Sequence, residues 1–329
     1  MRVLITGGTG FIGSRLALRS MERGHDVVIL GQVNTPAEEQ NCRLVESKGA
    51  RVVLGAVTDK TLIASCTEGT ELVFHLAAAQ HEANVPDQHF WDVNVEGTRN
   101  LLEASVHHGV KRFVHGSTIG VYGEAMEGEI DEQTALKPDN IYGVTKREGE
   151  GLALSFCDQI PVSVVRISET YGPGDRRLLK LFKAIQRGAF FMIGRGDNMH
   201  QLIYVDDLID GMYRAAEEDS AVGEIFVLAG GEVLTTQQMV STIGEVLSAR
   251  LRRWHAPLWP FYVAAVLMEK TLRPLGIQPP LHRRRLNFFI KSFYFSQAKA
   301  ARILDFHPRR DFREGVKLTA EWYKQSGLL

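Results

Sequence analysis

A tyrosine and a lysine four positions apart are the residues of this sequence best suited to acid–base chemistry. Tyr142 and Lys146 stand in the stretch I-Y-G-V-T-K, and in a helix four residues make about one turn, which places the phenol and the ammonium on one face. The lysine charge would then lower the tyrosine pKa toward the range in which the phenol can give or take a proton. Because an isolated pair of this kind is more often an exposed feature of a helix, the interpretation depends on the segments around it.

A hydroxyl-bearing segment precedes the pair. The stretch G-S-T-I-G-V-Y-G at 116–123 follows the run K-R-F-V-H, which is typical of a buried strand. A hydroxyl at the end of that strand, from Thr118 or its neighbour Ser117, can hold a substrate oxygen and stabilise the charge that develops as hydride moves. Such a hydroxyl together with Tyr142 and Lys146 therefore predicts an oxidoreductase centre.

The first strand leads into a signature of dinucleotide binding. Directly after V-L-I at 3–5, T-G-G-T-G-F-I-G places Gly7, Gly10 and Gly13 in a G-x-x-G-x-x-G pattern that opens a helical segment. Glycines there allow a tight turn and let backbone N–H groups and the positive end of the helix approach a pyrophosphate. Strand, loop and helix together predict a dinucleotide site.

The side chain that selects the coenzyme is missing from its usual place. At the end of the second strand, a carboxylate binds the ribose 2′-hydroxyl of NAD and a basic group binds the 2′-phosphate of NADP. The sequence has Gly31 and Gln32 there, with no arginine or lysine before Arg43. Both coenzymes therefore stay open.

Strand and helix patterns alternate through the first half of the chain. Continuous apolar strands separated by helical spacing are typical of a parallel sheet with helices on both faces. The sequence therefore predicts an α/β fold with a doubly wound Rossmann sheet. The expected strands cover 3–5, 26–30, 51–54, 72–77, 111–117 and 162–168, and the clearest helices cover 11–22, 88–108 and 141–157.

The second half is less regular, because glycine and proline interrupt it from about residue 172. We expect residues 1–170 to form the dinucleotide-binding domain, with later strands from 200–230 returning to it. Residues 171–329 would form mainly a smaller C-terminal substrate-binding lobe. Helical segments are expected at 176–187, 206–217, 235–249, 297–304 and 311–325.

Composition and charge exclude several classes of protein. The 329 residues are 44% hydrophobic and 23% charged, as in ordinary globular chains, and the net charge of −1 gives no basic excess for a nucleic-acid partner. Three scattered cysteines suggest neither a disulfide framework nor a metal site. The N-terminal run has no room for a signal peptide, and the longest apolar run, 259–268, is too short to span a membrane. A cytoplasmic protein is expected.

Taken together, the motifs resemble those of the extended short-chain dehydrogenases/reductases, a family that includes nucleotide-sugar epimerases and dehydratases and 3β-hydroxysteroid dehydrogenases. The resemblance covers nearly the whole chain. It is more specific for the family than for the substrate. It rests on TGGTGFIG, HLAA at 75–78, NVEGT at 94–98, STIGVYG, YGVTK, YGPGD at 171–175, LIYVDDL at 202–208 and the closing ARILDFHPR, FREG and EWY.

The resemblance implies a role for each motif. Thr118, Tyr142 and Lys146 become the catalytic residues, with Tyr142 as general acid and base and Lys146 as its helper. The family also implies a homodimer formed through the helices near 88–108 and 141–157. The coenzyme, NAD or NADP, would contact Gly7, Gly10, Phe11, Ile12, Gly13, Gly31, Gln32, Ala56, Val57, Leu76, Ala77, Ala78, Asn94, Ser117, Tyr142 and Lys146. The substrate would contact Gln80, His81, Thr118, Glu169, Arg176 and His200.

Departures from the family pattern limit the reaction. The 4,6-dehydratases place an Asp-Glu pair directly after the catalytic threonine, where this chain has Ile119 and Gly120, so dehydration is not expected. Sugar-nucleotide epimerases have an arginine for the diphosphate and an asparagine where this chain has His200 and Glu169. Another basic residue would have to supply the missing charge.

Three functions remain open. The favoured one is an NAD(P)-dependent epimerase or dehydrogenase that acts on a secondary alcohol or ketone of a nucleotide sugar. The alternative substrate is a steroid-like or other hydrophobic alcohol or ketone. The third function is a non-catalytic regulator that senses the coenzyme, against which the intact catalytic set argues.

A basic and aromatic segment at 250–291 is not explained by these motifs. It holds nine arginines and lysines, with Glu269 as its one acid. Interleaved aromatic residues include Trp254, Trp259 and Tyr262. The segment is either a solvated face whose aromatic residues fill the small lobe, or a surface that meets a phosphorylated substrate or an anionic membrane.

Overall fold

A seven-stranded sheet forms the centre of the protein, in the strand order β12-β7-β5-β4-β1-β2-β3. Every neighbouring pair in it is parallel, so the doubly wound Rossmann sheet is confirmed. The computed structural model describes residues 1–80, 85–124, 127–252, 254–272 and 283–329. The strands are β1 (Arg2–Thr6), β2 (Asp26–Gly31), β3 (Arg51–Leu54), β4 (Leu72–His75), β5 (Arg112–Thr118), β7 (Val162–Ile167) and β12 (Ile225–Leu228).

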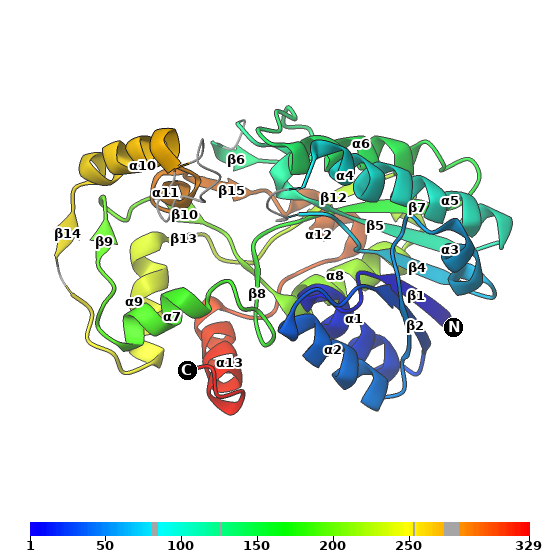
Figure 1. Cartoon of the computed structure of the whole chain (residues 1–329), viewed down its shortest axis with the longest axis horizontal. Helices are drawn as coiled ribbons and strands as arrows, with labels where there is room; N and C mark the ends of the chain where they lie inside the picture. Colours follow the sequence, from blue (N-terminus) through cyan, green and yellow to red (C-terminus); the bar gives the residue numbers. More distant parts are fainter. Residues whose placement is uncertain (81–84, 125–126, 253, 273–282) are drawn as a thin grey trace.

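Helices cover both faces of this sheet (Figure 1). The apolar side chains of the strands alternate between two buried clusters, because successive strand residues point to opposite faces. One cluster is closed by α1 (Phe11–Glu22), α2 (Pro36–Ser47), α8 (Val205–Glu217) and α12 (Ala298–Leu304). The other is closed by α3 (Lys60–Thr67), α5 (Gly97–His107) and α6 (Ile141–Leu154).

The helix expected at 88–108 has a wide turn inside it. It begins as α4 (Asp87–Trp91), passes through the π-helical turn η1 (Asp92–Glu96) and continues as α5. A π-helical turn places one more residue in the turn than an α-helix and is often found at functional sites. Here it holds Asn94, which is buried and makes contacts described below.

A smaller lobe is built from short pieces, most of which follow β7 in the chain. Its strands are two or three residues long and pair in twos, such as β8 (Thr170–Tyr171) with β11 (Ile203–Tyr204). The other pairs are β9 (Met192–Ile193) with β14 (His255–Ala256), β10 (Met199–His200) with β13 (Leu234–Thr235), and β6 (Gly128–Ile130) with β15 (Phe293–Phe295). The helices are α7 (Leu179–Gln186), α9 (Thr236–Val246), α10 (Leu258–Leu272), α11 (Arg283–Ile290) and α13 (Phe312–Gln325), and short 3₁₀ turns are η2 (Ile119–Val121) and η3 (Asp219–Ala221).

A third apolar cluster holds this lobe together. Aromatic and aliphatic side chains of α7, α9 and α13 meet there, and Phe182 contacts Tyr323 edge to face. Within the described ranges, no helix combines the length and the apolar composition that crossing a bilayer requires. The two lobes meet where the strands of the central sheet end, and this junction holds the site described next.

Candidate active site

A cavity of about 1750 Å³ runs along the carboxyl edge of the sheet. Its walls are the loop after β1, the ends of β2, β4, β5 and β7, and segments of the smaller lobe. Pockets that hold one drug-sized ligand measure roughly 300–1,000 Å³. This cavity therefore has room for a dinucleotide and a second molecule together.

Most of the residues predicted from the sequence line this cavity. Asn94 and Arg176 are not among its lining residues, and His81 lies outside the described residues. Those that do line it are Gly7, Gly10, Phe11, Ile12, Gly13, Gly31, Gln32, Ala56, Val57, Leu76, Ala77, Ala78, Gln80, Ser117, Thr118, Tyr142, Lys146, Glu169 and His200.

The glycine loop fits the phosphates of a dinucleotide, because side chains are excluded from it. Gly7 has φ of +70°, and a Cβ there would lie 2.8 Å from the Ala77 nitrogen. A Cβ at Gly13 would lie 2.3 Å from the Gly7 carbonyl oxygen. Helix α1 begins directly after Gly10 with no side-chain cap, so its first N–H groups face the cavity edge without a side-chain acceptor.

The adenosine end of the cavity differs from the usual pattern. A Cβ at Gly31 would lie 2.7 Å from the Thr9 hydroxyl oxygen, so no carboxylate side chain fits at this position without a shift. Two charged residues that the sequence reasoning missed, Glu38 and Lys60, line the cavity nearby. Glu38 accepts hydrogen bonds from the Asn34 N–H at 2.8 Å and from the helix-capping hydroxyl before α2. The T-x-x-E spacing is a helix-start signal that would have found this helix.

The start of α6 brings Tyr142 to the end of β5. The Asn140 side chain caps the helix by accepting from the Gly143 N–H at 3.0 Å. A Cβ at Gly143 would lie 2.7 Å from the Gly120 carbonyl oxygen, so only glycine lets the helix approach this closely. Thr118 accepts from the Gly120 N–H at 3.1 Å and is hydrogen-bonded to Tyr142. The two hydroxyls predicted to act together therefore touch.

Burial sets the pKa values of the tyrosine and the lysine. Burial raises the pKa of Tyr142 to about 12, and the hydrogen bond with Thr118 opposes this change. The Lys146 ammonium donates to the Gly116 carbonyl at 2.6 Å, and burial lowers its pKa to about 8, against the attraction of Glu150. The tyrosine pKa thus moves in the direction opposite to the one expected from the spacing, because loss of water contact is the largest influence on the phenol.

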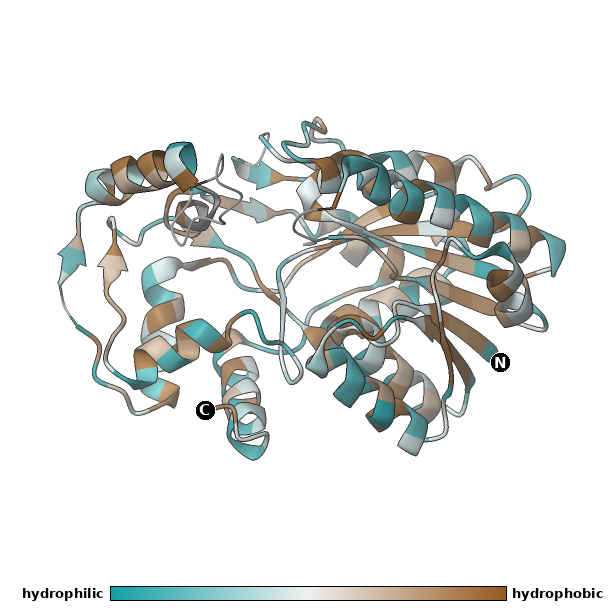
Figure 2. Cartoon of the chain, in the orientation of Figure 1, coloured by the Kyte–Doolittle hydropathy of each residue, from teal (hydrophilic) through white to brown (hydrophobic). Residues whose placement is uncertain are grey.

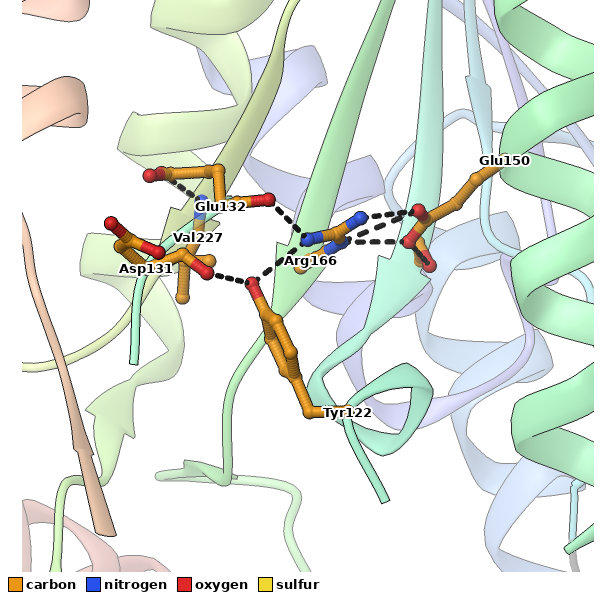
Figure 3. A network of polar contacts seen from close by, with 7 residues as sticks. Tyr122, Asp131, Glu132, Glu150, Arg166 and Val227 are labelled. Atoms are coloured by element: carbon orange, nitrogen blue, oxygen red, sulfur yellow. Dashed lines mark hydrogen bonds and ion pairs between the residues drawn. The ribbon is translucent and has the colours of Figure 1, made fainter. Parts of the chain in front are cut away.

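A buried ion pair lies behind the corner formed by Thr118, Tyr142 and Lys146. Glu150 is one helical turn beyond Lys146 and makes an ion pair with Arg166, and both side chains are about 2% exposed. The Ser117 hydroxyl donates to the same carboxylate at 2.5 Å. Figure 3 shows Arg166 between Glu150 on one side and Tyr122 with the backbone of Glu132 on the other. Because every polar group of this cluster has a partner, it fixes β5, α6 and β7 relative to one another.

Two buried polar residues hold the loop after β4. Asn94 accepts from the Ala79 N–H at 2.8 Å and donates to its carbonyl at 3.1 Å, so it clamps this loop from behind. His75 bonds to Thr6 at 2.7 Å and to Thr98 at 2.9 Å. Burial lowers the pKa of His75 to about 3, so it is neutral and part of the core.

At the far end of the cavity, Glu169 and His200 face each other at 3.7 Å. The hydrogen bonds around His200 fix the role of its Nε2: the Thr236 hydroxyl donates to the side-chain Oδ1 of Asn198, and the Asn198 side-chain Nδ2 donates to the carbonyls of Phe288 and Lys291. The His200 Nε2 must therefore donate, to Thr236 at 3.0 Å or to a carbonyl at 3.1 Å. Its Nδ1 faces the Glu169 carboxylate. Burial is the largest single influence on the pKa of Glu169 and raises it. The neighbouring His200 opposes burial, and the net change in the pKa is downward.

Neighbouring arginines have different positions. Arg176 donates to Gln40 on α2 at 2.5 Å and lies outside the lining. Arg177 does line the cavity, bound to Asp175 and to the Thr170 carbonyl. Sequence spacing cannot distinguish two consecutive arginines in a loop.

The chain is similar to known proteins over most of its length. The family profile described as "NAD dependent epimerase/dehydratase family" matches residues 3–229. A dTDP-glucose 4,6-dehydratase of Streptomyces antibioticus is 29% identical over 99% of this chain and 93% of its own length. The uncharacterized UDP-glucose epimerase YtcB of Bacillus subtilis is 30% identical over 75% of this chain and 82% of its own length.

A solved structure has the same arrangement. MoeE5, solved in complex with UDP-glucuronic acid and NAD, matches 99% of this chain and 100% of its own with a TM-score of 0.77 and 25% identity.

Proposed function

The chain belongs to the NAD-dependent epimerase/dehydratase family and is an enzyme of the extended short-chain dehydrogenase/reductase type, and from this premise we propose that it transfers hydride at a secondary alcohol of a nucleotide sugar. One observation carries the proposal. Thr118 and Tyr142 are hydrogen-bonded to each other and line the same cavity as the glycine loop, with Lys146 beside them. The names of two relatives of this chain, a dTDP-glucose 4,6-dehydratase and an uncharacterized UDP-glucose epimerase, point to the same class of substrate.

NAD, when bound, supplies the carbon that takes up and returns hydride. The chain's own residues would hold it: the loop from Gly7 to Gly13 would meet the phosphates, and Lys146 would hold the nicotinamide ribose, as the family resemblance implies. Tyr142 is neutral in the free protein because its pKa is about 12. It can therefore donate its proton to a ketone oxygen and take it back from a hydroxyl, while the Thr118 hydroxyl holds that oxygen.

The proposed reaction is epimerisation or net oxidation rather than dehydration. Elimination of water needs an acid and a base next to the catalytic threonine. The side chains there are those of Ile119, which is 8% exposed, and Gly120, and neither can move a proton. A ketone released from the site makes the enzyme a dehydrogenase. A ketone that turns over and takes hydride on its other face makes it an epimerase.

A hydrophobic alcohol or ketone is the second candidate substrate. It is favoured by the chemistry of the far end of the cavity, where Phe288 and Phe293 form part of the wall. Glu169 there would repel a diphosphate, whereas it can accept a hydrogen bond from a substrate hydroxyl. The group that the substrate presents to Glu169, a diphosphate or a hydroxyl, therefore distinguishes the two candidates.

We also propose, as the less specific parts of this function, a preference for NAD and a homodimer formed through α5 and α6. Residues 171–329 act mainly as the substrate lobe, while β12 from this half completes the sheet. Coenzyme carried through purification, measured by native mass spectrometry, distinguishes NAD from NADP, since the two differ by one phosphate.

Replacing Tyr142 with Phe tests the catalytic proposal. The variant should bind coenzyme as the wild type does but lose about 10²–10⁴-fold in turnover, the usual contribution of a general acid or base. The control is Tyr262→Phe, which removes the hydroxyl of a tyrosine that is 45% exposed on α10. Unchanged turnover in the Tyr142 variant would overturn the role of this phenol, whereas a wild type that binds coenzyme without turning over any substrate would favour a coenzyme-sensing regulator instead.

A thermal-shift screen tests the substrate. UDP-, GDP- and dTDP-sugars are compared with sterols and aliphatic ketones, each in the presence of coenzyme. Binding to the folded state raises the melting temperature in proportion to ligand saturation. Stabilisation by sterols or ketones and by none of the sugars would replace the nucleotide sugar with the hydrophobic candidate.

A further inference from the structure

The helix α10 has an inverted distribution of polar and apolar side chains. A surface helix normally turns its apolar side toward the core and its charges toward water. In α10 the two buried residues are Ala265 and the charged Glu269. On the outside, Trp259 is 70% exposed and Leu267 is 58% exposed.

The exposed apolar side chains form a stripe. Trp259, Val263 and Leu267 follow one another at four-residue intervals, so they share one face of α10, and Tyr262 lies beside them. Trp254 extends the stripe before the helix, since Phe191 stacks against both Trp254 and the first turn of α10. We call these five residues, Trp254, Trp259, Tyr262, Val263 and Leu267, the α10 stripe.

The stripe is a patch rather than ordinary scatter. Of the eleven large hydrophobic side chains that are exposed in the described residues, six lie between 254 and 290. Single exposed apolar residues need no explanation, but a contiguous group marks an interaction surface. Figure 2 shows hydrophobic residues along α10 at the outer rim of the smaller lobe, far from the brown strands of the central sheet.

Basic residues border the stripe. Arg250 and Arg252 precede it and Lys270 follows Leu267, and all three are exposed. The nearby acid, Glu269, points inward and lines the cavity. The outer face of this segment therefore combines aromatic and aliphatic side chains with positive charge only, among the described residues from 250 to 272.

The charge around the α10 stripe favours a lipid surface over a second copy of this chain as its partner. A symmetric contact with a second copy would place the stripe of one molecule on that of the other and bring the same basic residues together, which costs electrostatic energy. An anionic lipid surface accepts the apolar side chains in its interface and attracts the basic ones. Tryptophan and tyrosine, three of the five residues of the stripe, favour the level of the headgroups.

We propose that the α10 stripe docks this protein on an anionic lipid bilayer. The 15 residues of α10 are about 22 Å long at 1.5 Å per residue, so the helix lies in the plane of the interface and does not cross the membrane. Because Glu269 on its inner side lines the cavity, docking places one wall of the substrate end next to the bilayer surface.

Vesicle flotation of the full-length protein tests the proposal. The protein should float with phosphatidylcholine vesicles that contain phosphatidylglycerol, and much less with phosphatidylcholine alone or at high salt. The double variant Trp259→Ser with Leu267→Ser should reduce binding by about tenfold or more, since it removes much of the apolar insertion. Arg252→Gln with Lys270→Gln should weaken binding to the vesicles that contain phosphatidylglycerol and leave binding to phosphatidylcholine vesicles unchanged.

Matched controls separate docking from unfolding. Leu44→Ser with Leu54→Ser removes two leucines that are 44% and 60% exposed in the coenzyme half, and it should float like the wild type. All variants should keep the wild-type melting temperature and coenzyme content, since the changed side chains are exposed. Failure of the wild type to float, equal flotation of the two serine variants, or a dimer that forms through the stripe without lipid would each overturn the proposal.

Discussion

The two ends of the cavity are built in different ways. At the coenzyme end, the lining residues stand where parallel strands of the central sheet end or in the helices that cover the sheet, and glycines let these segments approach closely. At the substrate end, Glu169 and His200 stand next to or within strands of two residues, and Phe288 comes from a short helix. The carboxyl ends of parallel strands always meet at one edge, whereas short pieces have no such rule. The coenzyme end can therefore be placed from strand order and spacing, whereas Glu169 and His200 could be placed at the substrate end only through the resemblance to a family.

The largest effect should come from the ion pair that braces the catalytic corner. Glu150→Gln leaves the buried Arg166 charge without its carboxylate, which should lower the free energy of unfolding by about 3–5 kcal/mol. Urea denaturation measures this. Glu39→Gln removes a carboxylate from an ion pair with Arg43 whose partners are 52% and 76% exposed, and it should cost below about 1 kcal/mol. Equal losses in the two variants would show that the buried cluster does not brace the corner.

The buried ammonium of Lys146 predicts that the stability of the protein depends on pH. The pKa of Lys146 is about 8 in the folded protein and about 10.4 in an unfolded chain. Between these values the unfolded chain binds more protons, so the stability of the wild type should rise with pH. Relative to Lys146→Met, the gain from pH 8 to pH 10 should be about 2 kcal/mol.

The matched control is Lys317→Met, which removes an exposed lysine. Its stability should follow that of the wild type across the same pH range. If the Lys146 variant also follows the wild type, the ammonium does not carry the cost of burial assigned to it.

Two glycines of α6, Gly143 and Gly151, test how closely this helix must approach the end of β5. Gly143→Ala places a Cβ 2.7 Å from the Gly120 carbonyl oxygen, so the first turn of α6 must shift and carry Tyr142 away from Thr118. Since a misplacement of about 1 Å can cost about 10²-fold, turnover should fall by roughly 10–100-fold. Gly151→Ala lies on the same helix with nothing within 4 Å of the new Cβ, and it should keep full turnover.

The sequence predicted the parts of this molecule that follow regular patterns. Strand segments, the glycine loop and the Y-x-x-x-K spacing each repeat a fixed geometry, and Thr118, Tyr142 and Lys146 line one cavity as that geometry requires. The helix α2 was missed because its residues have a weak apolar pattern, although Thr35 and Glu38 marked its start. The tyrosine pKa was predicted in the opposite direction, since spacing gives neighbours but not burial. The lining by Phe288 and Phe293 depends on how residues far apart in the chain pack, which no local pattern encodes.

The smallest effect should come from the substrate end, and it decides what that end binds. Glu169 is 42% exposed at its side chain, so Glu169→Gln should barely change stability. If the diphosphate of a nucleotide sugar lies near this carboxylate, removing the negative charge relieves repulsion, and KM should fall by about threefold, as one partly exposed charge is worth below about 1 kcal/mol. A rise in KM would mean that the carboxylate accepts a hydrogen bond from a substrate hydroxyl, which both a sugar and a hydrophobic alcohol can supply. Because turnover should stay the same in either case, a fall in KM supports the nucleotide sugar, and a rise shows that no diphosphate lies beside Glu169.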